Sequence, residues 1–207
     1  MSTSRYASYN ARNIYQHFTK QKALFLCIDA LDLKSRDEPA PKMKLRLCEF
    51  DTTQDEHERM KTQIDVFLSA GEFLRLCHDV LNGVTSRKKR MAEGKANAGY
   101  FEKYGGTTKP QVISTKLTLV DGIGEDADFA FLATTGPGRV TSIGGIVPAA
   151  PGTPEAPDVP TTSVFVNMKN DDLKELCLIG QAYLQSFISM DLAERLAVVR
   201  GSRVQKK

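Results

Sequence analysis

Cationic and aromatic side chains gather in two segments of the chain. Residues 1–28 hold four lysines and arginines and no carboxylate, and residues 84–110 hold seven against two glutamates. Five of the six tyrosines fall in the same two segments. Ammonium and guanidinium groups neutralise phosphates, and rings stack on bases, so this composition suits a single-stranded nucleic acid. Solvated loops with aromatic side chains that merely pack fit it equally well, and the composition leaves both interpretations open.

The acidic residues are concentrated elsewhere. Residues 121–172 hold eight carboxylates, with Arg139 and Lys169 as the bases. The formal net charge of +3 over 207 residues therefore conceals a basic part and an acidic part. With 41% hydrophobic residues, the chain can fold around a core without disulfides or a structural metal. This balance excludes a polybasic scaffold and a disordered chain.

Motifs for catalysis are missing from the sequence. No phosphate-binding glycine loop opens a helix, and the three histidines have no partners at metal-ligand spacing. The acids between Asp121 and Asp128 lack the spacing of a calcium loop. The four cysteines form no C-x-x-C pair and predict reduced, buried thiols. We expect a protein that is not an enzyme and has no cofactor and no metal site.

Alternating apolar residues predict the elements that would carry the basic and aromatic side chains. In the first half, four strands are expected at 13–18, 22–33, 42–50 and 62–68. A capping box at Ser69-Ala-Gly-Glu72 then predicts a helix that ends at Asn82-Gly83. The first half therefore has a β-β-β-β-α order.

The second half predicts the same order. Four strands are expected at 111–120, 128–134, 139–147 and 161–168, with hairpin turns at Asp121-Gly-Ile-Gly and Thr135-Gly-Pro-Gly. A last helix begins at Asn170, where Asp171 and Asp172 favour the positive end of its dipole, and runs to about Val199.

The junctions between the fourth strand and the helix also match in sequence. Val66-Phe-Leu68 corresponds to Val164-Phe-Val166, and Glu72–Cys77 corresponds to Asp172–Cys177. We therefore expect an α+β fold with two antiparallel four-stranded sheets, each followed by a helix, as a pseudo-two-fold duplicated β-β-β-β-α unit. The expected domain plan is a flexible N-terminus (1–11), one domain of two repeats (12–83 and 111–199) joined by a basic loop (84–110), and a basic, disordered tail (200–207).

Three stretches and the order of elements resemble a known family. The stretches are Phe18-Thr-Lys-Gln-Lys-Ala-Leu24, Ile64–Phe73 and Thr162–Leu173. Together they resemble the Whirly family of plant single-stranded-DNA-binding proteins, although Gln21 and Leu24 depart from its Y-K-G-K-A-A stretch. The resemblance implies tetramers formed through the helices, with extended single strands bound along the sheets at low sequence specificity.

Basic and aromatic residues on the expected strands and loop form the predicted interface. We expect single-stranded DNA, in preference to RNA, to meet these side chains: Tyr15, Phe18, Lys20, Lys22, Lys44, Arg46, Arg87, Lys88, Lys89, Arg90, Tyr100, Phe101 and Tyr104. Phe18, Lys20 and Lys22 are expected on one face of a strand that opens at Phe18. The segment Arg87–Lys109 is expected to be a mobile loop that orders on nucleic acid. Edge charges that discourage aggregation are the alternative for Lys20 and Lys22.

A protein–protein adaptor without nucleic-acid binding is the alternative function. An exposed sheet face and the proline-rich segment 148–160 would then bind a polypeptide. Salt dependence separates the two functions, since phosphate contacts weaken steeply with salt. We expect a homotetramer with no membrane contact. No signal peptide is visible and a cytoplasmic location is expected, although the carboxylate-free N-terminus also suits an organellar transit peptide.

Overall fold

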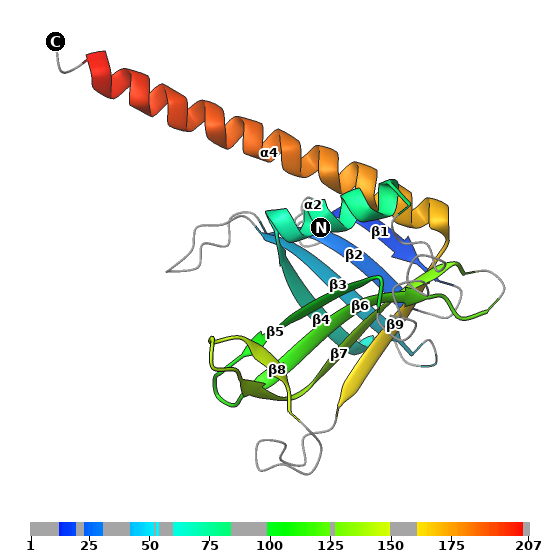
Figure 1. Cartoon of the computed structure of the whole chain (residues 1–207). Coiled ribbons are helices and arrows are strands. Elements are labelled where there is room, and N and C mark those ends of the chain that lie inside the picture. Colours follow the sequence, from blue (N-terminus) through cyan, green and yellow to red (C-terminus); the bar gives the residue numbers. More distant parts are fainter. Residues whose placement is uncertain are drawn as a thin grey trace, which may run out of the picture.

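The computed structural model describes residues 13–19, 23–30, 42–51, 53, 60–83, 99–124, 127–149 and 161–204. It shows an α+β fold of antiparallel sheets and two helices, which confirms the predicted class. Both helices lie on the same side of the sheets (Figure 1). One hydrophobic core joins side chains from both sheets and both helices.

The first sheet has the order β1-β2-β3-β4, and every neighbouring pair is antiparallel. Its strands are β1 (Asn13–Phe18), β2 (Ala23–Ala30), β3 (Lys42–Phe50) and β4 (Met60–Ser69). On β3, Met43, Leu45 and Leu47 are fully buried, while Lys44 and Arg46 face the other side. From Lys42 to Leu47, alternate residues of this strand therefore face opposite sides of the sheet.

The helix α2 (Ala70–Leu81) begins at the predicted capping box. The Ser69 N–H donates to Glu72 Oε2 at 2.9 Å, and the Glu72 N–H donates to Ser69 Oγ at 3.3 Å. The helix ends at Asn82, and the following Gly83 has φ +69°. Both ends of α2 are thus where the sequence predicts them.

The second sheet has five strands where four were expected. They are β5 (Phe101–Thr107), β6 (Ile113–Asp121), β7 (Phe129–Val140), β8 (Ile146–Pro148) and β9 (Thr162–Met168). The pairing runs β5-β6-β7-β9, and β8 folds back onto the far end of β7.

Three predictions in this half are wrong. The strand expected at 139–147 is instead the end of β7, a turn and the start of β8. β5 lies within the segment predicted as a mobile basic loop; of that loop, residues 84–98 lie outside the described part of the chain. Thr135-Gly-Pro-Gly lies inside β7 and makes no turn. Its second glycine, Gly138, instead allows β7 to lie close to the neighbouring strand β6, because a Cβ on Gly138 would lie 2.7 Å from the backbone nitrogen of Ser114.

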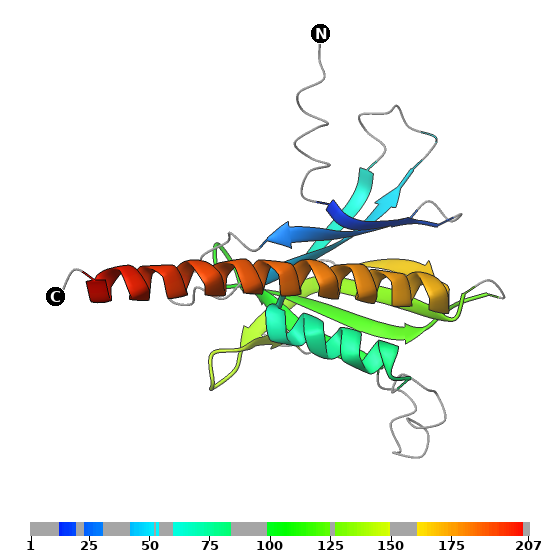
Figure 2. The same ribbon diagram turned by 90° about the horizontal axis from the view of Figure 1, so that it is seen from above.

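The second helix, α4 (Asn170–Val204), is longer than expected and extends into the segment predicted as a disordered tail. Its first half lies beside α2, and its second half projects beyond the sheets (Figures 1 and 2). Cys77 on α2 and Cys177 on α4 are both fully buried, and neither forms a disulfide. None of the helices among the described residues is long and apolar enough to cross a membrane.

Candidate nucleic-acid interface

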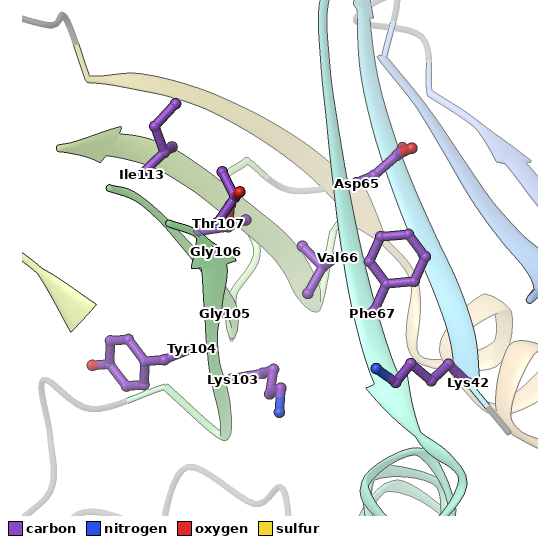
Figure 3. A pocket seen from close by; sticks show the side chains of 11 residues that line it. Lys42, Asp65, Val66, Phe67, Lys103, Tyr104, Gly105, Gly106, Thr107 and Ile113 are labelled. Atoms are coloured by element: carbon purple, nitrogen blue, oxygen red, sulfur yellow. The ribbon is translucent and has the colours of Figure 1, made fainter. Parts of the chain in front are cut away.

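A cavity separates the two sheets where an edge strand of each is exposed. Within the described residues, β4 pairs only with β3, and β5 pairs only with β6. Their free edges face each other across a cavity of about 610 Å³ (Figure 3). Its lining includes Lys42, Val66 and Phe67 on one side and Lys103 and Gly105 on the other. This volume falls within the roughly 300–1,000 Å³ range of ligand sites.

Each sheet carries a half-exposed aromatic ring opposite a lysine beside this cavity. Phe67 on β4 is 40% exposed and pairs across the strands with Lys44 on β3. Tyr104 on β5 is 39% exposed and pairs with Lys116 on β6. The Lys116 Nζ lies 5.2 Å from the centroid of the Tyr104 ring. Each pair offers a flat apolar surface next to a positive charge.

The cation beside Tyr104 is held in place by a carboxylate. Lys116 Nζ lies 3.2 Å from Glu102 Oε1. Burial acts to lower the pKa of Lys116, but its contact with Tyr104 and the Glu102 carboxylate outweigh burial and raise the pKa. Lys116 therefore remains charged throughout the physiological range of pH.

The cations of the first sheet converge on one carboxylate. Arg46 donates two hydrogen bonds to Asp65, from Nε to Oδ1 at 2.7 Å and from Nη2 to Oδ2 at 2.8 Å. Lys44 Nζ lies 3.8 Å from the same Asp65 Oδ2. Such a two-bond pair orders the guanidinium and occupies its carboxylate-facing side. Arg46, predicted as a phosphate contact, is therefore largely committed to Asp65.

Two further lysines extend to the cavity from opposite sheets. Lys103 reaches from β5 toward β4, whereas Tyr104 points to the opposite side of β5 (Figure 3). Lys103 Nζ lies 2.6 Å from Glu72 Oε1, at the capping box of α2. Lys42 extends to the same end of the cavity from β3 and has no ion-pair partner among the described residues.

The charges around the cavity do not cancel. Lys42, Lys44, Arg46 and Lys103 supply four positive charges, and Asp65 and Glu72 supply two negative charges. Two positive charges are therefore left to attract an anion. The surplus lies next to the two ring–lysine pairs, which puts cations and rings at one place on the surface.

Two of the predicted contact residues are buried, which corrects their assignment. Tyr15 is 8% exposed, and its hydroxyl donates to the backbone oxygen of Asp172 at 3.1 Å. Burial, assisted by the carboxylates of Asp172 and Glu175, raises the pKa of Tyr15 to about 12. Phe101 is 6% exposed and packs in the core, with Arg75 5.8 Å from its ring centroid. Neither ring is open for stacking.

The other predicted residues are dispersed. Tyr100 is half-buried, stands edge-on to Phe129 at 5.5 Å between ring centroids, and donates to the carboxylate of Asp121. Phe18 is 63% exposed at the end of β1, opposite Leu24 of β2. Phe18 and the residues from Ala23 onward therefore lie on two antiparallel strands, and the expected single strand from Phe18 to Phe25 is wrong. The remaining predicted cations lie outside the described residues: Lys20, Lys22, Arg87, Lys88, Lys89 and Arg90.

Sequence reasoning missed four residues of this site, namely Lys42, Phe67, Lys103 and Lys116. Phe67 left a signal, because Val66-Phe67-Leu68 is apolar on both faces of a strand whose other outward residues are polar. An apolar residue on the solvent face of a strand is a candidate for binding. The lysines left none, since only the pairing of strands puts them beside the rings.

No group of three or more metal-ligating side chains lies together in the part of the chain that the structure describes. Comparisons of the chain with protein-family models, with curated proteins and with solved structures gave no match. The function must therefore be argued from the residues themselves.

Proposed function

We propose that this protein binds single-stranded nucleic acid across the two ring–lysine pairs, Phe67–Lys44 and Tyr104–Lys116. The observation that carries the proposal is the repetition of one arrangement on both sheets, a half-exposed ring opposite a lysine. Bases stack on aromatic rings without regard to sequence, and lysines neutralise the neighbouring phosphates. Apart from Lys44, one surplus positive charge at the cavity adds to the attraction.

The rings favour a single strand over a duplex. In a duplex the base faces are stacked on one another, and only base edges and the backbone are accessible. A ring of Phe67 or Tyr104 has no base face to contact until the strands separate. Single-stranded DNA is the preferred ligand in this proposal, with low sequence specificity over most of the bound strand.

The resemblance to the Whirly family belongs to the same proposal. In it, the chain is a duplicated β-β-β-β-α unit in which α2 and α4 are equivalent helices. The observed order of four strands and α2, followed by a second antiparallel sheet and α4, supports this plan. The additional strand β8 would then be an insertion at the end of β7.

Self-association through α4 completes the proposal, with a homotetramer as the preferred assembly. The helix exposes large apolar side chains along its length, including Leu178, Ile188, Met190, Leu192 and Leu196. Leu178, Ile188, Leu192 and Leu196 lie toward one face of the helix, and an exposed apolar face of this kind marks an interface. The same surface favours the second candidate function, an adaptor that binds another polypeptide through α4.

Fluorescence anisotropy tests the proposal. The wild-type protein is titrated into labelled dT12, a single-stranded RNA of the same length and a duplex DNA, each in low and high salt. We expect the single strands to bind more tightly than the duplex, with affinity that falls steeply with salt. An adaptor would bind none of the three.

Two substitutions locate the contact. Lys44→Ala with Lys116→Ala should weaken binding of dT12 about tenfold. The slope of log affinity against log salt concentration should also become shallower, by up to about 0.7 for each phosphate that is no longer neutralised. Lys61→Ala is the matched control, because Lys61 is 62% exposed on β4 and pairs with Glu49, which does not line the cavity. Equal affinities for the double variant and the control would refute the proposed contact.

A further inference from the structure

We propose that the inter-sheet cavity is a subsite for one unstacked nucleotide, and that it gives the bound strand one position at which base identity matters. This inference rests on the proposed function and deepens it. It starts from the placement of the cavity between β4, which carries Phe67, and β5, which carries Tyr104. A strand that contacts both rings must therefore pass the cavity mouth.

The cavity has room for a base because β5 has no side chain there. Gly105 lines the cavity, and a Cβ added to it would meet no heavy atom within 4 Å. The adjacent Gly106 has φ +150°, and a Cβ on it would lie 2.0 Å from the backbone oxygen of Ile113. Gly106 thus shapes the strand, while Gly105 leaves the space open.

The polar groups of the cavity match the parts of a nucleotide. Lys42 extends to one end of it, beside the Lys103–Glu72 ion pair from the opposite sheet, and can bind a phosphate there (Figure 3). Val66 and Phe67 of β4 line one wall, and Ile113 and Thr115 of β6 line the other. A base directed into the space would leave its phosphate near Lys42 and its ring against apolar atoms.

The free strand edges supply the selectivity. Alternate residues of an edge strand direct an unpaired N–H and C=O away from the sheet. The free edges of β4 and β5 both face the cavity. These donors and acceptors have fixed positions, and hydrogen bonds to the edge of an unstacked base are how proteins distinguish bases in single strands. A stacking ring alone makes no such distinction.

DNA strands that carry a single base test this selectivity, because a strand with one base cannot shift along the protein to place a different base in the cavity. A twelve-unit DNA backbone with abasic sites throughout is compared with four strands that each carry one central base, A, C, G or T. In the wild-type protein, we expect the preferred base to raise affinity about tenfold over the fully abasic strand, and the four bases to differ by about threefold or more. Affinity for dT12 is measured alongside as the test of the proposed function itself.

Substitutions that fill the cavity provide a second test of the nucleotide subsite. Gly105→Leu places a side chain in the space, and Gly105→Ala, which adds one methyl group, is the matched control at the same position. We expect Gly105→Leu to abolish the differences among the four bases while binding of dT12 falls by less than about fivefold. Thermal unfolding of both variants checks the fold. If the leucine variant does not fold, smaller differences among the four bases in Gly105→Val than in Gly105→Ala support the inference.

The two failures are distinguishable. If dT12 does not bind the wild-type protein, the proposed function falls and this inference with it. If dT12 binds but the four bases give equal gains, or if Gly105→Leu folds and keeps the wild-type differences among the bases, the nucleotide subsite is wrong. In that case the two facing strand edges would suit an extended peptide that adds to a sheet.

Discussion

Gly180 of α4 lies directly against the ring of Phe73 of α2. A Cβ on Gly180 would lie 2.5 Å from Cζ and 2.7 Å from Cε1 of that ring. Phe73 is fully buried, so the ring has little space into which it can move. The absence of a side chain at one residue therefore sets how closely the two helices approach.

Gly180→Ala should lower stability, although alanine normally stabilises the interior of a helix by about 1 kcal/mol over glycine. The added methyl group overlaps the Phe73 ring, and overpacking of a core costs about 1–3 kcal/mol. Gly71→Ala is the matched control, because Gly71 is exposed on α2 and a Cβ there meets nothing within 4 Å. Thermal unfolding should show a lower Tm for Gly180→Ala and an unchanged or higher Tm for Gly71→Ala. A higher Tm for both variants would mean that α2 and α4 can move apart to accept the added methyl group without loss of stability.

Asp65→Asn should strengthen nucleic-acid binding while it weakens the fold. The substitution removes the negative charge that Arg46 and Lys44 share, which leaves both cations available to phosphates. We expect tighter binding of dT12, and a slope of log affinity against log salt concentration that is steeper by up to about 0.7 for each additional phosphate neutralised. The free energy of unfolding should decrease by about 1–2 kcal/mol.

Anisotropy and denaturant titration measure these two effects separately. Glu49→Gln is the control, since it removes one carboxylate from an exposed pair with Lys61 and should change neither quantity appreciably. Weaker binding by Asp65→Asn would show that Asp65 positions Arg46 for contact and does not mask it.

Ser69→Ala should cost about 1 kcal/mol of stability, because it removes half of the capping box of α2.

The same capping box makes the stability of the protein depend on pH. Burial acts to raise the pKa of Glu72, but hydrogen bonds from Lys103 and Ser69 outweigh burial and lower it below the ordinary value of 4.5. A carboxyl whose pKa is depressed on folding stabilises the protein above its unfolded pKa, and this contribution is lost as pH falls through the folded value.

Thermal unfolding between pH 7 and pH 3 measures this contribution. The wild-type protein should lose stability below about pH 4.5, and Glu72→Gln should lose less over the same interval because it has no proton to bind. Parallel curves for the two proteins would assign the acid sensitivity to other carboxylates.

The sequence predicted the elements whose signal is local. Alternation placed β1 and β3 at their observed bounds, and the Ser69–Glu72 box placed the start of α2. β5 was missed because its sequence, FEKYGGT, has two charged residues and two glycines and presents only Phe101 to the core. Its position depends on pairing with β6, which no local pattern reports.

The site was less predictable than the fold, because it depends on which strands lie side by side. Tyr104 was identified from composition, but its partner Lys116 becomes visible only through the register of β5 and β6. Composition also could not separate rings that stack from rings that pack: Tyr15 and Tyr104 both lie in basic segments, yet Tyr15 is 8% exposed and Tyr104 is 39% exposed. Burial follows from the whole fold and not from neighbours in the chain.

The projecting half of α4 should mediate self-association. Leu192 and Leu196 are 55% and 48% exposed and lie four residues apart, so they share one face of the helix. This part of α4 extends beyond both sheets, where nothing in its own chain among the described residues covers it (Figure 2). A helix in a protein gains most of its stability from packing of its apolar face. A second copy of the chain supplies such a surface.

Leu192→Glu with Leu196→Glu should therefore reduce the proposed homotetramer to a dimer or monomer, since each interface would bury several carboxylates. Light scattering at micromolar concentration measures the mass. Ala193→Glu with Ala197→Glu adds the same charges to exposed positions one residue further along, on a neighbouring face of the helix, and should leave the mass unchanged. A monomeric wild-type protein, or equal masses for the two double variants, would show that this face of α4 does not hold copies of the chain together. If the leucine double variant forms a smaller assembly and also binds dT12 more weakly, the DNA strand contacts more than one copy of the protein. Neither leucine lines the cavity or touches the ring–lysine pairs.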